Sequence, residues 1–198
     1  GDTIIVMPGV YYENLSIVSK SVYLTSMFLF DSDSVSIAST IIDGQNNGSP
    51  TIKINQIGPS TISGFTIRNG SNSNWMFGGG ISIEGYGEQP IDLINLIITD
   101  NISNTNHHGA GIGIGPTRTV NITNTKFLNN NSNGLGVAVY SWGSIVNIDK
   151  CLFLDHPNWL LFSDNGSFRI YNSIFHSSGQ IALGTDFNFI NSTFYSPN

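Results

Sequence analysis

Asp100 and Asp155 are the acidic residues whose spacing could support a reaction. Each follows an apolar position of a repeated motif by two residues, and Asn69 and Asn129 occupy the same place in other copies. If the copies stack as strands ~4.8 Å apart, the two carboxylates are on the order of 9–10 Å apart, near the upper end of the spacing in an inverting glycosidase. The sequence favours a simpler interpretation, a row of turns in which Asn and Asp side chains cap backbone amides. Calcium is the ion that such turn oxygens could bind.

Aromatic side chains are the candidate ligand-binding groups, with Trp75, Tyr140 and Trp142 first among them. Trp75 and Trp159 precede glycine-led strands, whereas Tyr86 and Trp142 follow them. These rings would flank one shallow face lined by Gly, Ser and Ala, and rings beside polar Asn and Ser can stack on sugars. The competing interpretation, which the sequence favours slightly, is that they cover core beneath the loops.

The remaining reactive side chains predict neither a metal site nor a nucleophile. His107 and His108 have no acidic or thiol neighbour in sequence, which indicates a solvated loop rather than a metal centre. Asp155 and His156 could form an acid–base dyad, but no serine or cysteine nucleophile stands beside them, so a turn is favoured. Cys151, the only cysteine, is expected to be a small buried thiol.

Composition excludes several classes of function. Hydrophobic residues make up 39% of the 198 residues and charged residues 10%, against roughly 25% charged in an ordinary soluble domain. The formal net charge is −6 with seven Lys and Arg and no basic cluster, which argues against nucleic acid as a partner. The longest apolar runs are far shorter than roughly 18 residues, so no membrane insertion is expected.

Two interleaved repeats predict the fold. One has the form apolar-x-Asn-x-x-Phe and occurs at 122–127, 170–175 and 189–194. The other places small residues before alternating apolar positions, as GGGISI at 78–83 and GAGIGI at 109–114. Alternation of the two predicts a solenoid of about seven coils, each with three short strands. A β-sandwich is the competing fold, but it does not need the same Asn at each bend.

Details of the coil follow from the same repeats. The first strand of a coil is the glycine-led one, also expected at GLGVAV (134–139) and at Thr3–Val6. Between the second and third strands, a left-handed bend residue is expected, Asn in most coils and Gly64 in the earliest copy. The segments 25–50 and 68–79 are expected to be long loops after the third strand.

The chain resembles the right-handed parallel β-helix proteins of the pectin-lyase-like superfamily, in particular their uncharacterised bacterial surface members. Gly1-Asp2-Thr3, Pro8-Gly9 and Tyr12-Glu13-Asn14 match the first coil of those proteins, and later segments follow in the expected order. The resemblance implies a right-handed parallel β-helix over residues 1–198, a fragment of a longer protein without its N-terminal cap. It also implies an extracellular or cell-surface location and contact with neighbouring segments of the parent chain.

The resemblance leaves activity open, because the superfamily holds lyases, hydrolases and adhesins. Its enzymes place their chemistry on the outer face of the first strand, where this sequence is expected to present Ser82, Gly113 and Ala138, which are inert. Glu84, Gly115 and Tyr140 are expected just beyond them. We therefore expect a non-catalytic surface that binds glycans or a cell-surface protein, with no cofactor except possible calcium. The alternatives are a polysaccharide lyase or glycoside hydrolase, and a purely structural repeat.

Overall fold

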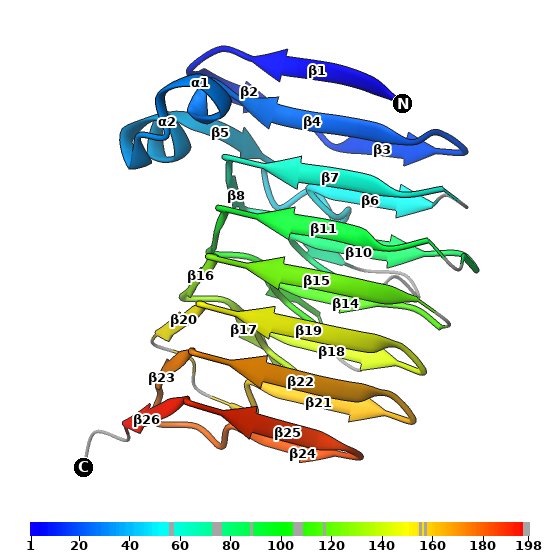
Figure 1. Cartoon of the computed structure of the whole chain (residues 1–198), viewed down its shortest axis with the longest axis vertical. Helices are drawn as coiled ribbons and strands as arrows, with labels where there is room; N and C mark the ends of the chain where they lie inside the picture. The colour runs from blue at the N-terminus through cyan, green and yellow to red at the C-terminus, as the bar shows by residue number, and fades with distance from the viewer. Residues whose placement is uncertain are drawn as a thin grey trace.

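Short runs of alternating apolar residues fold into stacked parallel strands, and the chain is a right-handed parallel β-helix in this computed structural model (Figure 1). The front strands run leftward and the rear strands rightward as the chain descends, which gives the right-handed sense. The structure describes residues 1–55, 58–72, 77–87, 89–104, 109–116, 118–154, 156 and 158–195. Each coil contributes one strand to each of three long sheets, as the repeats predict.

The first-strand sheet contains the glycine-led strands. Its members are β3 (Leu15–Val18), β6 (Ile52–Asn55), β10 (Ile81–Glu84), β14 (Ile112–Ile114), β18 (Val139–Trp142), β21 (Leu161–Asp164) and β24 (Ala182–Gly184). The second-strand sheet contains β1 (Asp2–Val6), β4 (Val22–Ser26), β7 (Ser60–Ser63), β11 (Ile91–Ile94), β15 (Thr119–Thr123), β19 (Ile145–Asp149), β22 (Ser167–Tyr171) and β25 (Phe187–Ile190).

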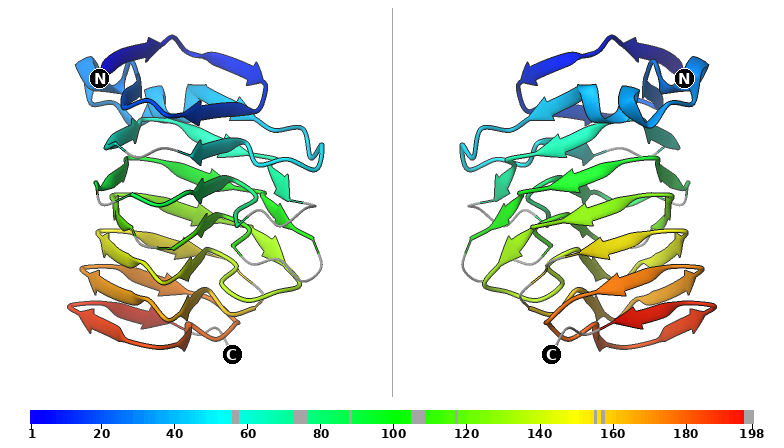
Figure 2. Two further views of the ribbon diagram at one scale, coloured as in Figure 1. Left: turned by 90° about the vertical axis from the view of Figure 1, so that its right-hand side faces the viewer. Right: turned by 90° about the vertical axis from the view of Figure 1, so that its left-hand side faces the viewer.

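The third-strand sheet contains the strands that carry the phenylalanine positions. Its members are β2 (Gly9–Tyr12), β5 (Thr40–Asp43), β8 (Thr66–Arg68), β12 (Ile97–Thr99), β16 (Lys126–Leu128), β20 (Leu152–Leu154), β23 (Ile174–His176) and β26 (Thr193–Tyr195). A small fourth sheet lies beyond it, formed by β9 (Ser71–Asn72), β13 (Ile102–Ser103) and β17 (Asn131–Ser132). The side views show how regularly the coils stack (Figure 2).

Columns of like residues fill the core. Ile81 pairs with Ile112, which pairs with Val139, and all three side chains are fully buried. Phe127 stacks on Phe153 with ring centroids 4.7 Å apart, and the column continues through Phe175 and Phe194. The predicted phenylalanine column is confirmed, but Phe194 is 48% exposed because it lies on the last strand of its sheet.

The bend between the second and third strands has the predicted left-handed backbone. Gly64 has a φ of 84° and Asn95, Asn124, Asn172 and Asn191 have φ between 50° and 56°. The amide of Asn124 donates to the side-chain oxygen of Asn95 at 2.6 Å. Lys150 occupies the bend between Asn124 and Asn172, so Asn172 donates to Asp149 instead. The predicted asparagine ladder is therefore confirmed only between Asn95 and Asn124.

Two expectations about the first coils are wrong. Thr3–Val6 belongs to β1, which pairs with β4 in the second-strand sheet, and the first strand of that coil is β3. The segment 25–50 is not a loop after the third strand. It contains α1 (Phe28–Asp31) and α2 (Ser34–Ser39), inserted between a second strand and the third strand β5. The sequence repeat did not reveal this insertion, because α1 and α2 take the place of the bend residue by which each coil is recognised.

Candidate ligand-binding site

The outer face of the first-strand sheet carries larger residues than the sequence predicted. Gly113 pairs with Ser82 on one side and with Tyr140 on the other, so GLGVAV lies two residues out of the expected alignment. Ala138 is fully buried rather than outward. The column continues from Tyr140 to Phe162. An aromatic surface therefore begins where an inert one was expected.

A segment of the chain covers part of this face. The backbone N–H of Phe77 donates to the hydroxyl of Ser82 at 3.3 Å. A Cβ added to Gly113 would overlap the carbonyl of Phe77, and one on Gly78 would overlap β10. Ser82 and Gly113 are small because backbone lies directly on them, and both are buried. Their size reflects packing rather than an open, unreactive cleft.

Four aromatic rings form a cluster at the edge of this covered region. Phe77 stacks on Tyr140 with centroids 6.1 Å apart, and Tyr140 stacks on Phe162 at 5.7 Å. Trp142 lies 6.1 Å from Phe77 with its ring tilted by 32°. Burial, with a smaller contribution from Asp164, raises the pKa of the Tyr140 hydroxyl to about 12, so it stays protonated and can act as a hydrogen-bond donor. Sequence reasoning identified Tyr140 and Trp142 but missed Phe77 and Phe162.

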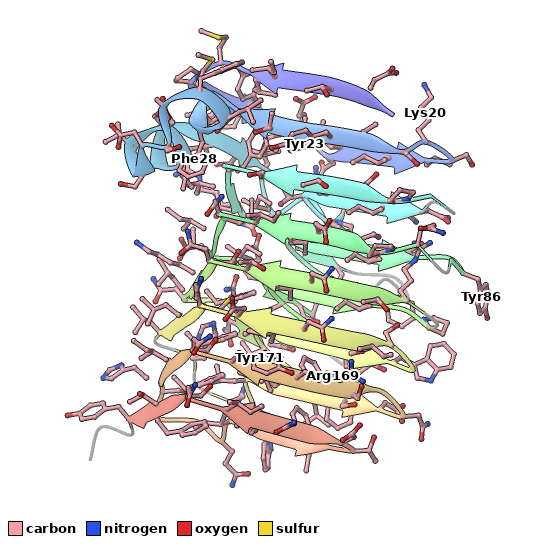
Figure 3. All side chains as sticks on the ribbon, in the orientation of Figure 1. Lys20, Tyr23, Phe28, Tyr86, Arg169 and Tyr171 are labelled. Atoms are coloured by element: carbon pink, nitrogen blue, oxygen red, sulfur yellow. The ribbon has the colours of Figure 1, made fainter. Side chains whose placement is uncertain are left out.

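The exposed continuation of the cluster is the corner between the first-strand and second-strand sheets. Trp142 ends β18 and is 41% exposed. Its register partner on the next strand is Asp164, which is also exposed. Glu84 ends β10, and Tyr86, two residues later, is 72% exposed and points away from the body of the helix (Figure 3). We call Glu84, Tyr86, Trp142 and Asp164 the corner site.

Buried groups hold the corner site in place. Glu84 accepts from the ammonium of Lys53 at 2.8 Å and from the hydroxyl of Ser82 at 3.1 Å. Arg118, almost fully buried, donates from Nε to the carbonyl of Gly85 at 3.3 Å. Gly85 has a φ of 78°, a conformation in which glycine is strongly preferred. These contacts with Lys53, Ser82 and Arg118 hold the turn that carries Tyr86 in place.

The carboxylates of this face do not converge. Glu84 lies on β10 and Asp164 on β21, with β14 and β18 between them. Three strand spacings of ~4.8 Å place them about 14 Å apart, beyond the roughly 6.5–9.5 Å of an inverting glycosidase and the roughly 5–5.5 Å of a retaining one. Their separation therefore does not match the carboxylate pair of either glycosidase mechanism.

The other acidic column consists of turns where the structure describes it. Asn69, Asp100 and Asn129 have φ between 49° and 54°. Asp100 accepts from the hydroxyl of Thr99 at 2.7 Å, and the amide of Asn69 donates to Asp43. Asp155 lies outside the described residues, so its predicted distance from Asp100 is untested.

The remaining candidates are buried or lie outside the described residues. Cys151 is 2% exposed, and burial raises the pKa of its thiol to about 12, which makes it unreactive. His156 is buried and does not face solvent. Trp75, His107 and His108 also lie outside the described residues. Among the residues that are described, no group of three His, Cys, Asp or Glu side chains could hold a metal ion.

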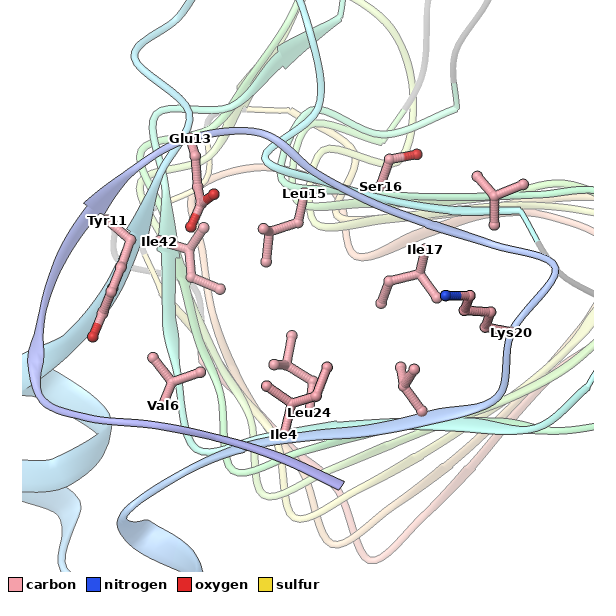
Figure 4. A pocket seen from close by; sticks show the side chains of 12 residues that line it. Ile4, Val6, Tyr11, Glu13, Leu15, Ser16, Ile17, Lys20, Leu24 and Ile42 are labelled. Carbon is pink, nitrogen blue, oxygen red and sulfur yellow. The ribbon is translucent and has the colours of Figure 1, made fainter. Parts of the chain in front are cut away.

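A cavity of 580 Å³ opens elsewhere, at the N-terminal end of the core. Figure 4 shows that Ile4, Leu15 and Leu24 point into it, with Glu13 and Lys20 at its rim. Its walls are the inner faces of the first coil, which elsewhere along the helix are covered by the next coil. It is the open end of the core and not a cleft shaped around reacting groups.

No known protein family, curated protein or solved structure matches this chain. The all-β parallel solenoid is therefore established by its own geometry. In the described part of the chain, no helix has the length and apolar character needed to span a bilayer.

Proposed function

We propose that this chain is a non-catalytic, extracellular β-helix module that binds glycans at the corner site. The observation that carries the proposal is the exposed ring of Trp142, which continues a stacked aromatic cluster and is paired in register with the carboxylate of Asp164. The resemblance to surface members of the pectin-lyase-like superfamily supports the extracellular location.

The chemistry of the corner site suits a sugar chain. An aromatic face contacts the apolar C–H side of a pyranose ring, and carboxylates accept hydrogen bonds from its hydroxyl groups. Glu84 and Asp164 lie on strands with two strands between them, so the two ends of the site are separated by about 14 Å along the axis. That distance fits a ligand of more than one sugar unit. Asp164 and the net charge of −6 favour a neutral or cationic glycan over an acidic one.

Affinity for immobilised neutral glycans tests this proposal. We expect the chain to be retained, and Trp142→Ala to lower the affinity about tenfold, since one aromatic contact is worth roughly 0.5–1.5 kcal/mol beyond its area. Tyr12→Ala is the matched control, because Tyr12 is also exposed but lies on β2, in another sheet. Equal retention of both variants, or no retention of the parent chain, would contradict the proposal.

The enzyme alternative has its own outcome in the same experiment. Incubation with pectate, alginate and neutral glycans, with calcium present, would release unsaturated products or new reducing ends if the chain were a lyase or a hydrolase. Loss of those products on replacing Asp100 or Asp155 would assign the reaction to the acidic turn column. We expect no product from any of these substrates.

A further inference from the structure

The outer face of the third-strand sheet changes character along its length. Near the N-terminal end it is covered, because α2 packs on it: Ile37 of α2 is buried, and its carbonyl accepts from the hydroxyl of Thr66 on β8 at 3.0 Å. The same outward column then continues uncovered through Ile97, Lys126, Leu152 and Ile174.

The uncovered part is an apolar strip. Ile174 is 49% exposed, and Leu128, Leu152 and Leu154 are half-buried. These four residues, which we call the strip, occupy the outward positions of β16, β20 and β23. These side chains are contiguous and partly exposed, and adjoining apolar side chains on a sheet face can form an interaction surface.

The inserted helices expose a second apolar surface of opposite charge character. Phe30 and Val35 are each 64% exposed, and Asp31 and Asp33 lie between them. The strip instead has two exposed lysines at its edge, Lys126 on β16 and Lys150 in the bend before β20, where Lys150 Nζ lies 4.0 Å from a carboxylate oxygen of Asp149. Helices α1 and α2 and the strands β16, β20 and β23 lie on the same side of the molecule (Figure 1), so the acidic insertion and the strip with its lysines share that side.

We propose that two copies of this chain associate face to face and antiparallel, with α1 and α2 of each copy resting on the strip of the other. A two-fold axis between β12 and β16 would exchange the two patches, since the insertion covers β5 and β8 and the strip spans β16, β20 and β23. Such an interface is self-complementary and closes at two subunits.

Shape and charge support this occupant over an unrelated one. A groove of 570 Å³ separates the insertion from the sheet, between Asp31, Asp33 and Ile37 on one side and Ile97 and Lys126 on the other. The insertion projects from the N-terminal end of this sheet face (Figure 1), so an inverted second copy can place its own insertion over the strip. Acidic side chains of one copy then face lysines of the other, which favours this orientation over the parallel one.

Sedimentation velocity tests the association. We expect a species of twice the 21.4 kDa monomer mass, and at least a tenfold weaker association for Ile174→Asp. Ile145→Asp is the matched control, because Ile145 is an exposed outward residue of a different sheet. Both variants should keep the far-ultraviolet spectrum and melting temperature of the parent, since neither side chain lies in the core.

Cross-linking tests the orientation. Oxidation of a Val35→Cys and Ile174→Cys double variant should give a covalent dimer, whereas Val35→Cys with Ile145→Cys should not. A chain that stays monomeric at every attainable concentration would overturn the proposal. So would a dimer that Ile174→Asp leaves intact, or one in which both cysteine pairs cross-link equally.

Discussion

At the scale of single residues, a buried polar column is the feature that the sequence did not reveal. Asn101 accepts from the backbone N–H of Gly70 at 2.9 Å, and Asn130 accepts from that of Asn101 at 3.1 Å. Both asparagines are fully buried, and their amides also donate to carbonyls in the core. The register of β16 with β20 places His156 next in this column. The expectation of a turn or dyad at His156 followed from its neighbour Asp155 and not from its coil position.

His156 is the weak member of that column. It is 1% exposed, and within the described part of the chain neither ring nitrogen has a hydrogen-bond partner. An unmade hydrogen bond of a buried polar group costs roughly 1–3 kcal/mol. We expect His156→Asn to continue the column of hydrogen-bonded asparagines formed by Asn101 and Asn130. The free energy of unfolding should rise by about 1 kcal/mol, measured by urea denaturation. A lower midpoint for this variant would show that the imidazole packs better than an amide.

Acid should act on the fold through the same residue. Burial lowers the pKa of His156 to about 4 from the ordinary 6.5. Between these values the unfolded chain binds a proton that the folded chain does not, so stability falls as the pH drops from about 6.5 to 4, by roughly 3 kcal/mol. Thermal melts across this range should show the loss in the parent chain and a smaller one in His156→Asn. Equal losses would assign the acid sensitivity to other groups.

At the scale of elements, the phenylalanine column is the most consequential packing unit. Phe127 is fully buried between Ile98 and Phe153. We expect Phe127→Ala to lower the free energy of unfolding by about 3–5 kcal/mol, because truncation leaves a cavity among stacked rings. Phe194→Ala is the matched control and should cost much less, since Phe194 is half exposed. Denaturant titration of the two variants compares these costs directly.

The covering segment at Phe77 gives a second element-scale prediction. A methyl group on Gly113 would overlap the carbonyl of Phe77, so Gly113→Ala must displace the segment from β14. We expect a loss of about 1–3 kcal/mol and increased proteolysis near residue 77. Gly9→Ala, whose added methyl would meet ordinary contacts of 3.5 Å or more, should leave both properties unchanged. If cleavage near residue 77 were unaltered in Gly113→Ala, the position of the segment would not depend on its contact with β14.

The elements also show what sequence could and could not predict. The bend residues and the inward apolar positions were predictable, because each has a local steric or period-two signature. The alignment of β18 was not, because Val137 and Val139 are both fully buried, and only the pairing with the neighbouring coil places Val139 rather than Val137 opposite Ile112. Asp164 was missed for the same reason, since its place beside Trp142 depends on that register. The position of Phe77 depends on a contact between coils, and such a contact produces no periodic pattern in the sequence.

At the scale of the whole molecule, both ends of the solenoid leave apolar side chains without a covering coil. Ile4 and Ile5 are exposed on β1, and Leu183 and Phe194 are exposed on the last strands of their sheets. Solenoids need polar caps at their terminal repeats to remain soluble, and open strand edges favour pairing with another chain.

We therefore expect the chain to form assemblies that grow end to end at high concentration, in addition to the closed face-to-face dimer. Light scattering should show a mass that rises with concentration, because head-to-tail contacts do not close. The double variant Ile5→Lys, Phe194→Lys should stop this growth, since strand pairing would then bring charged side chains against apolar ones, yet it should leave the dimer intact. Ile174→Asp should do the opposite and abolish the dimer while growth continues. A mass that never exceeds the dimer would mean that the exposed ends do not associate.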